Sequence, residues 1–125
     1  MIIGIGIDLV DIARIRAIIS KWDIRFLRKI YTSLEINYCD SKNKNRFQSY
    51  AGLFAAKEAF VKALGTGFRY IEWKEIEIKK DNLDKPTICL SGKANVIVSK
   101  RRIRAINLSI SHTKQLAIAQ VIIEG

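Results

Sequence analysis

The chain has 125 residues, of which 49% are hydrophobic and 27% charged, and its 22 Lys and Arg against 12 Asp and Glu give a formal net charge of +10. This composition excludes a disordered or fibrous chain and predicts one globular domain over residues 1–125. The excess positive charge should attract an acidic partner, which could be nucleic acid, an anionic membrane, an acidic protein or a phosphorylated cofactor.

Neither the N-terminus nor the cysteines indicate export. The apolar start is too short for a signal-peptide core and runs directly into Asp8 without a preceding basic region. No stretch approaches the run of about 18 apolar residues that a membrane-spanning helix needs. Cys39 and Cys89 lack metal-ligand or CxxC spacing, so we expect reduced thiols in a cytoplasmic protein that binds no membrane.

A buried strand followed by a helix is predicted at the start of the chain. Isoleucines alternate with two glycines over residues 2–7, and the glycines permit close packing against another element. We expect Asp8 to end this strand. Apolar residues recur at helical spacing over residues 9–22, with Asp11 where an N-cap or a first-turn acid would lie.

Basic residues follow along this helix at intervals of seven, four and three, namely Arg14, Lys21, Arg25 and Arg28. They form a single basic stripe if the helical geometry continues through Asp23. The stripe suits an acidic partner, whereas an ordinary solvated helix face is the alternative.

The next segment predicts a short helix and a basic loop. A Thr-Ser-Leu-Glu sequence that ends at Glu35 fits a capping box, so we expect a helix from near Ser33 to just before Ser41. This pattern gives Glu35 a structural rather than a catalytic role. Residues 42–46 form a polar, basic loop that could meet a phosphate.

Residues 54–67, with the sequence FAAKEAFVKALGTG, place charged side chains in an otherwise apolar helical run. At 3.6 residues per turn Phe54, Glu58 and Lys62 share one face, while alanines, Phe60 and Leu64 supply most of the buried surface. The Gly-Thr-Gly ending stops the helix and leaves backbone that a ligand can approach. Taken alone, the pattern equally fits a surface Glu-Lys pair with a glycine cap.

The second half of the chain predicts two hairpins with a helix between them. Its strands and helix are expected, in order, at residues 72–80, 87–90, 94–101, 107–111 and 116–123. The only histidine, His112, lies at the tip of the last hairpin, where ligands often bind, although a lone histidine is usually incidental. The predicted class is α+β, with a mainly antiparallel sheet packed against one long helix and shorter helices.

Asp8 and Glu58 are candidate metal ligands. A strand end forms a natural rim for a cleft, where Asp8 could converge with Glu58 from the long helix. Two carboxylates with open positions suit Mg²⁺, which keeps waters and often completes its shell with phosphate oxygens. Lys62, one turn beyond Glu58, would face the same phosphates. A helix N-cap is the alternative role for Asp8.

Three blocks of the sequence resemble the signature of the holo-acyl-carrier-protein synthase family, the small single-domain class of 4′-phosphopantetheinyl transferases. The blocks are GIGIDLVDIARI at residues 4–15, FAAKEAFVKALGTG at residues 54–67 and SISHT at residues 109–113. They occur in the family's order and at family-like spacing, so the resemblance spans essentially the whole chain.

The resemblance implies an enzyme of fatty acid biosynthesis. It would transfer the 4′-phosphopantetheine arm of coenzyme A (CoA) to a serine of apo-acyl-carrier protein and release adenosine 3′,5′-bisphosphate. The family's members require Mg²⁺ and are homotrimers with active sites at the subunit interfaces. An acidic carrier protein would also account for the +10 charge.

The resemblance also implies roles for individual residues. The catalytic positions are Asp8, Glu58 and Lys62, of which Asp8 and Glu58 match the metal ligands. The matching CoA contacts are Lys62, Gly65, His112 and Thr113. The surface for the acidic carrier protein matches Arg14, followed by Lys21, Arg25 and Arg28.

The chain departs from the family pattern in two places. Leu53 stands where relatives often carry an arginine that helps to hold a CoA phosphate. Lys44 and Arg46, together with Lys42, are the expected replacements from the preceding loop. Asp84 replaces a glycine that is common in the turn of the first predicted hairpin.

Two other functions would fit parts of the sequence. A basic nucleic-acid-binding module explains the charge, but such modules usually show an aromatic-studded strand or a recognition helix and need no paired carboxylates. Another Mg²⁺-dependent phosphotransferase explains the carboxylates, but no P-loop is present. We therefore expect no nucleic-acid partner.

Overall fold

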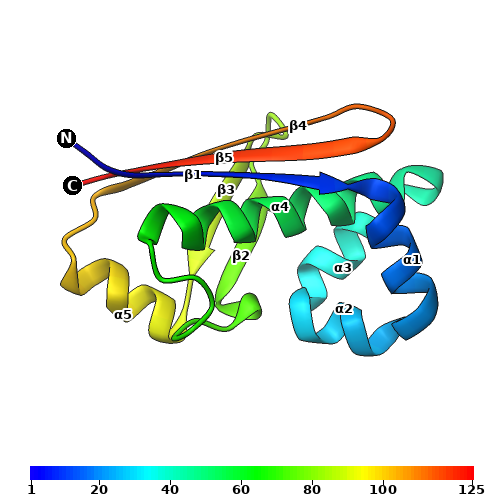
Figure 1. The fold of residues 1–125 in the computed structure, drawn as a ribbon, viewed down its shortest axis with the longest axis horizontal. Coiled ribbons are helices and arrows are strands. Elements are labelled where there is room, and N and C mark those ends of the chain that lie inside the picture. Colours follow the sequence, from blue (N-terminus) through cyan, green and yellow to red (C-terminus); the bar gives the residue numbers. More distant parts are fainter.

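The structure is a computed structural model that describes residues 1–125, and it has the predicted α+β architecture (Figure 1). The strands are β1 (Ile2–Asp11), β2 (Ile76–Lys80), β3 (Pro86–Leu90), β4 (Ala105–His112) and β5 (Leu116–Glu124). The helices are α1 (Ile12–Trp22), α2 (Ile24–Ile30), α3 (Ser33–Asp40), α4 (Arg46–Leu64) and α5 (Gly92–Lys100), with short 3₁₀ turns η1 (Asn43–Asn45) and η2 (Trp73–Glu75).

The strands form two antiparallel sheets. The larger sheet has the order β1-β5-β4, and β2 pairs with β3 in a separate hairpin. Because the first and last strands pair, the two termini lie side by side, as Figure 1 shows. Helix α4 runs along one face of the larger sheet, with α1 to α3 at one end of the molecule and α5 at the other.

The glycines of β1 let the sheet approach α4 closely. A Cβ atom added at Gly6 would overlap the Ala59 carbonyl oxygen, and one at Gly4 would overlap the Ala63 carbonyl oxygen. Alternating residues of a strand point to the same face, so Asp8 lies on this helix-facing side as well. The predicted close packing at the two glycines is therefore confirmed.

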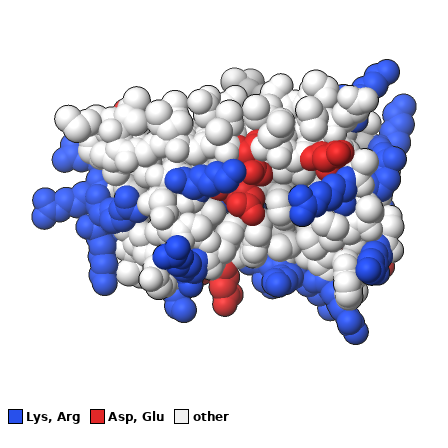
Figure 2. Space-filling view, in the orientation of Figure 1, with Lys and Arg blue, Asp and Glu red and all other residues white.

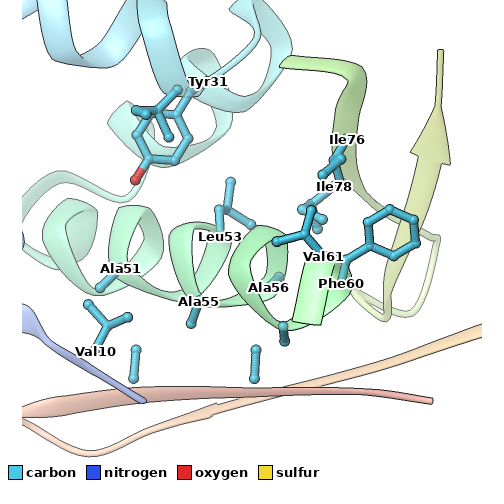
Figure 3. Packing of buried hydrophobic residues seen from close by; sticks show 14 of the residues in the cluster. Val10, Tyr31, Ala51, Leu53, Ala55, Ala56, Phe60, Val61, Ile76 and Ile78 are labelled. Carbon is cyan, nitrogen blue, oxygen red and sulfur yellow. The ribbon is translucent and has the colours of Figure 1, made fainter. Parts of the chain in front are cut away.

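Helix α4 is buried on nearly all sides, which explains its weakly patterned apolar sequence. Small residues such as Ala51 and Ala55 face the strands, whereas Phe60 and Val61 point toward the β2-β3 hairpin (Figure 3). The helix is thus the centre of the core, and any side chain on its few open positions is held rigidly. No helix, α4 included, is both long and apolar enough to cross a membrane.

Strand β1 is longer than predicted, since Asp8 does not end it. The strand continues to Asp11 because β5 offers a pairing partner along its whole length, with Asp8 opposite Ala119 and Asp11 opposite Leu116. Helix α1 accordingly begins at Ile12 instead of residue 9. Asp11 is its N-cap, as predicted, and accepts a 3.0 Å hydrogen bond from the Ala13 amide.

The prediction of one continuous basic stripe is wrong. Asp23 has a φ of 46° and separates α1 from α2. Aspartate is one of the few residues that tolerate positive φ, so it can end a helix at this sharp turn. The four basic residues are divided between the two helices, with Arg14 and Lys21 on α1 and Arg25 and Arg28 on α2.

Most of the other predicted elements are present with shifted ends. The capping box at the start of α3 is confirmed by hydrogen bonds between Thr32 and Glu35 in both directions. The hairpin of residues 72–90 is also confirmed, but its first strand begins only at Ile76, after η2. Similarly, His112 is the last residue of β4, so the hairpin tip begins at Thr113.

Candidate active site

Asp8 and Lys62 meet at the junction of β1 and α4. The Lys62 ammonium nitrogen lies 2.9 Å from Asp8 Oδ1 and donates a second hydrogen bond, of 3.1 Å, to the Ile7 carbonyl oxygen. The Asp8 side chain is 14% exposed and that of Lys62 is 51% exposed. The ion pair is therefore open to solvent on the lysine side, where a ligand could reach it.

Glu58 lies one turn before Lys62 and faces the same region. Burial raises the pKa of the Glu58 carboxyl above its ordinary value, repulsion from Asp8 raises it further, and Lys62 opposes both effects. Asp8 and Glu58 line the same cavity, so the two carboxylates lie near each other. The structure brings the three predicted catalytic residues together.

The carboxylates border a cavity of about 500 Å³. Arg14 of α1 lies at its rim, and Phe26 and Phe54 belong to its apolar wall. Figure 2 shows acidic side chains near the middle of this view of the surface, with lysine and arginine side chains around them. Such a cavity can hold an anionic group next to an apolar one.

The donor set fits a cation that needs few protein ligands. No three His, Cys, Asp or Glu side chains are grouped to hold a metal by themselves. Asp8 and Glu58 would supply two oxygen ligands, leaving the other positions for water or phosphate oxygens. This is how Mg²⁺ commonly binds in proteins.

Gly65 ends α4 as predicted and leaves its backbone accessible. Its φ of 78° is left-handed, and its amide donates to the Val61 and Lys62 carbonyl oxygens. A Cβ atom at Gly65 or Gly67 would meet nothing within 4 Å. A ligand could therefore lie directly against this turn, close in sequence to Lys62.

The remaining predicted CoA contacts lie elsewhere on the chain. His112 lines a second cavity, of about 280 Å³, which shares no residue with the cavity beside Asp8. Thr113 accepts hydrogen bonds from the Gln115 and Leu116 amides, of 3.2 and 3.1 Å, and so shapes the hairpin tip. A single chain does not unite these residues with the carboxylates in one cavity.

Of the three basic residues expected to replace an arginine at position 53, Lys42 lines the second cavity, whereas Lys44 and Arg46 do not. Lys44 is exposed in η1. Arg46 Nε lies 3.4 Å from Asp40 Oδ1, and its guanidinium lies 4.8 Å from the centre of the Phe47 ring. Arg46 thus lies beside a carboxylate and an aromatic ring, although its Nε makes no hydrogen bond.

The predicted partner residues lie on exposed helix surfaces. Arg14 is exposed beside the first cavity, and Lys21 lies 5.3 Å from the centre of the exposed Trp22 ring. Arg25 is exposed on α2, and Arg28 borders a third cavity, of about 440 Å³. Of the four basic residues only Arg14 lines the first cavity, and the four do not form one helical row.

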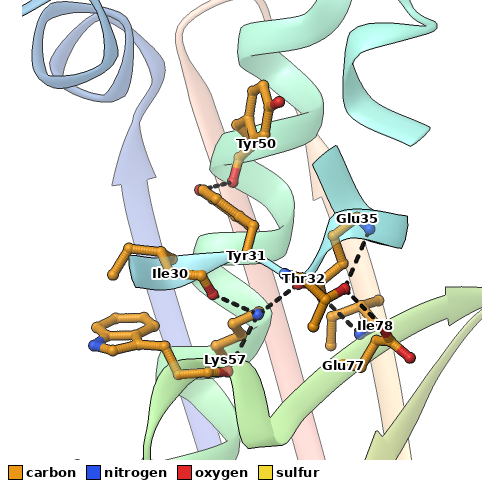
Figure 4. Close-up of polar contacts among 9 residues, drawn as sticks. Ile30, Tyr31, Thr32, Glu35, Tyr50, Lys57, Glu77 and Ile78 are labelled. Carbon is orange, nitrogen blue, oxygen red and sulfur yellow. Dashed lines mark hydrogen bonds and ion pairs between the residues drawn. The ribbon is translucent and has the colours of Figure 1, made fainter. Parts of the chain in front are cut away.

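Lys57 is a buried residue that sequence reasoning missed. Its ammonium group is fully buried and donates to Glu35 Oε1 (2.7 Å), the Ile30 carbonyl (2.7 Å) and the Trp73 carbonyl (3.2 Å), as Figure 4 shows. Glu35 also accepts from the Ile78 amide, which confirms its structural role. The sequence did contain a signal for this burial. The residues three and four positions before and after Lys57 are all apolar, which is typical of a buried helix face.

The sequence is similar to a known protein family over nearly its whole length. Residues 4–120 match the profile of the 4′-phosphopantetheinyl transferase superfamily. The holo-[acyl-carrier-protein] synthase of Halothermothrix orenii is 49% identical over 122 residues, covering 98% of this chain and 97% of the relative. That of Syntrophus aciditrophicus is 46% identical over 126 residues, covering 100% and 98%.

Solved structures agree with these relatives. The holo-[acyl-carrier-protein] synthase of Neisseria meningitidis superimposes with a TM-score of 0.92 at 33% identity, covering 100% of both chains. The Helicobacter pylori enzyme in complex with coenzyme A gives a TM-score of 0.85 at 36% identity, covering 96% of this chain and 99% of the other. The likeness extends over the whole fold described above.

Proposed function

We propose the function of this chain from its family. The chain belongs to the 4′-phosphopantetheinyl transferase superfamily, whose profile matches residues 4–120. The chain transfers the 4′-phosphopantetheine group from CoA to a serine of apo-acyl-carrier protein and releases adenosine 3′,5′-bisphosphate. One observation assigns this function to particular residues: Asp8, Glu58 and Lys62 converge beside one cavity.

Glu58 is the general base in this proposal. The serine oxygen bonds to the phosphorus on the pantetheine side, and the bond from that phosphorus to the adenosine bisphosphate oxygen breaks. Glu58 accepts the serine proton, directly or through a water molecule. In the metal-free chain burial and Asp8 raise the pKa of Glu58 above its ordinary value, which favours proton transfer, whereas bound Mg²⁺ would oppose this shift.

Asp8 and Lys62 hold the charged part of the donor. Asp8 and Glu58 are the residues that would hold a Mg²⁺ ion, which when bound offsets the charge on the phosphate oxygens. Lys62 has three N–H donors, of which Asp8 and the Ile7 carbonyl occupy two. The third can reach a phosphate oxygen, so the lysine need not leave its ion pair.

A mass-shift assay tests the transfer itself. Purified chain, CoA and Mg²⁺ are mixed with an apo-acyl-carrier protein, whose mass is followed by mass spectrometry. We expect the carrier protein to gain one phosphopantetheine group, at its acceptor serine only. An unchanged carrier mass with folded, metal-supplied protein would rule out the function.

A homotrimer is the second part of the proposal. The outer face of β1 carries exposed apolar side chains, among them Ile5 (59% exposed) and Leu9 (60% exposed). Such a contiguous apolar surface supports contact with another subunit. In addition, a head-to-tail ring could place the His112 tip of one subunit against the carboxylates of the next.

Replacing Ile5 by glutamate should therefore separate the subunits, because a buried charge opposes the apolar contact. We expect sedimentation velocity to show a trimer for the original chain and a monomer without transferase activity for the Ile5→Glu variant. Leu83→Glu, at a 90% exposed position in the β2-β3 turn, is the control. A monomeric original chain with full activity would refute the interface proposal.

The exposed basic residues of α1 and α2 are the surface for the acidic carrier protein in this proposal. Arg14→Glu should raise the KM for carrier protein roughly tenfold while leaving the KM for CoA nearly unchanged, because reversed charge weakens the encounter with an acidic protein. The effect should shrink as salt is added. Lys100→Glu, at the exposed end of α5, is a matched charge reversal. Equal effects of the two variants would contradict this assignment.

A further inference from the structure

We propose that Arg101, directly after α5, is a positioning residue for the CoA donor. Its side chain holds the C-terminal end of α4, where the turn of residues 65–67 leaves backbone open to a ligand. The inference rests on the proposed function, which places CoA against this turn. Arg101 belongs to none of the three sequence blocks described above, and it follows the residue that it holds by 37 positions.

The contact joins the ends of two helices. Arg101 Nη1 donates a 2.7 Å hydrogen bond to the carbonyl oxygen of Leu64, the last residue of α4. This N···O distance is at the short end of the usual range, as is typical of a charged donor. The Arg101 backbone is itself fixed, because its amide donates a 3.0 Å hydrogen bond to the Ile97 carbonyl oxygen of α5. The side chain therefore ties α4 to a second helix.

The Leu64 carbonyl needs a donor from outside α4. The last four carbonyl oxygens of a helix have no amide partner within the helix. The amides of residues 65–67 all donate to the Val61 carbonyl, and the Gly65 amide also donates to that of Lys62. Arg101 supplies the donor for Leu64, and it places a positive charge at the negative end of the helix dipole. Without the Arg101 side chain, this carbonyl of a 4% exposed residue would lose its protein donor.

The turn of residues 65–67 depends on the end of α4 for its position. Residues 65–72 belong to no helix or strand. Gly65 and Gly67 both have positive φ, of 78° and 59°, and their open sides have no protein atom packed against them. After the turn, the Phe68 ring stacks on Trp73 with 3.8 Å between the ring centres. The turn is thus fixed at two points, the end of α4 and the Phe68 ring, and Arg101 holds the first.

The catalytic candidates have a different support. Lys62 is held by Asp8 and by the Ile7 carbonyl oxygen, which both belong to β1, and Glu58 lies one turn further from the end of α4. Loss of the Arg101 contact should therefore move the turn and leave these side chains in place. It should weaken the binding of CoA while the chemical step is retained.

The test is Arg101→Met, assayed with CoA and apo-acyl-carrier protein. We expect the KM for CoA to rise about fivefold, within the range for the loss of one hydrogen bond, with kcat and the KM for carrier protein within twofold of the original values. Lys100→Met, which removes the neighbouring charge at the end of α5, is the matched control and should change none of these constants. An equal rise with Lys100→Met, or a fall in kcat without a rise in KM, would overturn the inference.

Arg101→Lys is the conservative variant. Its ammonium group can donate to the same carbonyl, so it should recover part of the loss in KM for CoA. A lysine variant no better than Arg101→Met would contradict the role of this hydrogen bond.

The salt dependence separates positioning from a direct contact between Arg101 and a CoA phosphate. Arg101 belongs to none of the ion pairs of the chain and donates to a neutral carbonyl. The ratio of the KM values of Arg101→Met and the original chain should therefore stay constant as salt is added, whereas a contact with phosphate weakens in salt. A ratio that falls toward one at high salt would overturn the positioning role.

Amide hydrogen exchange tests the same contact without turnover. In Arg101→Met the amides of residues 65–67 should exchange faster than in the original chain, while those of β5 should be unchanged. Equal exchange at the turn would overturn the inference even with a positive mass-shift assay. A negative mass-shift assay with the original chain would instead overturn the proposed function. Faster exchange throughout the chain, with a lower thermal unfolding midpoint, would show a general loss of fold and would also count against a positioning role.

Discussion

Glu58→Gln is expected to lower kcat/KM by about 10²–10⁴-fold, the usual contribution of a general base, while the chain stays folded. Glutamine has nearly the same size, so the packing of α4 is retained. The amide cannot accept the serine proton, and it is a weaker ligand for a cation than a carboxylate. Steady-state kinetics with a defined apo-carrier protein measure the effect. Glu77→Gln, on β2 away from the first cavity, is the control for a neutralised carboxylate.

The pH dependence provides a second measurement of the same role. The base must be deprotonated, so kcat/KM should rise with pH through the pKa of Glu58. Burial and then Asp8 raise this pKa in the metal-free chain, and bound Mg²⁺ would lower it. This limb of the profile should be absent from the residual activity of Glu58→Gln. An unchanged acidic limb in that variant would assign the base to another group.

A rise in pH should change the Glu58 contribution to stability in the opposite direction to kcat/KM. Because the pKa of Glu58 is raised on folding, the folded chain binds this proton more tightly than the unfolded chain does. The Glu58 contribution to stability therefore falls as pH rises from the ordinary carboxyl pKa through the raised one. Glu58→Gln should remove this decrease, so the variant is expected to be no less stable than the original chain at neutral pH. Such an exchange of stability for activity is common at active sites.

The parts of the fold that could be predicted depend on local pattern. The apolar length of α4, its glycine end and the capping box of α3 are encoded within a few residues of one another. The two glycines of β1 predicted that another element packs closely there, but not which one. The structure shows that this element is α4. Residue type and the expected end of a strand already made Asp8, Glu58 and Lys62 candidates, but the family resemblance, and not periodicity, supported the convergence of positions 8 and 58.

The errors arose where distant segments decide the local structure. Strand β1 continues past Asp8 because β5 pairs with it, and no pattern near Asp8 contains that information. At Asp23 the chain turns at a residue that could equally have continued a helix. The second cavity, which Lys42 and His112 line, is built from α3, α4, β2 and β4, so its charge could not be read along one element.

Lys57→Met is expected to destabilise the chain by about 3–5 kcal/mol, the usual effect of removing one partner from a buried ion pair. The change leaves the Glu35 carboxylate buried with only the Thr32 and Ile78 amides as donors. It also removes the ammonium donor from the buried Ile30 carbonyl and from the partly buried Trp73 carbonyl. Denaturant unfolding should show a lower midpoint with an unchanged slope.

Lys79→Met, which removes a 3.7 Å pair whose lysine is 51% exposed, is the matched comparison and should change stability by less than about 1 kcal/mol. The double variant Lys57→Met/Glu35→Met should lose less than the sum of its single variants, because the first change already leaves the second group unpaired. It should not recover the original stability, since Glu35 also caps α3 and accepts from Ile78. If Lys57→Met unfolded at the same denaturant concentration as Lys79→Met, the ion pair could not be what fixes α4 against the α2-α3 junction and the β2-β3 hairpin. In that case apolar packing alone would hold α4, and with it Glu58, in position.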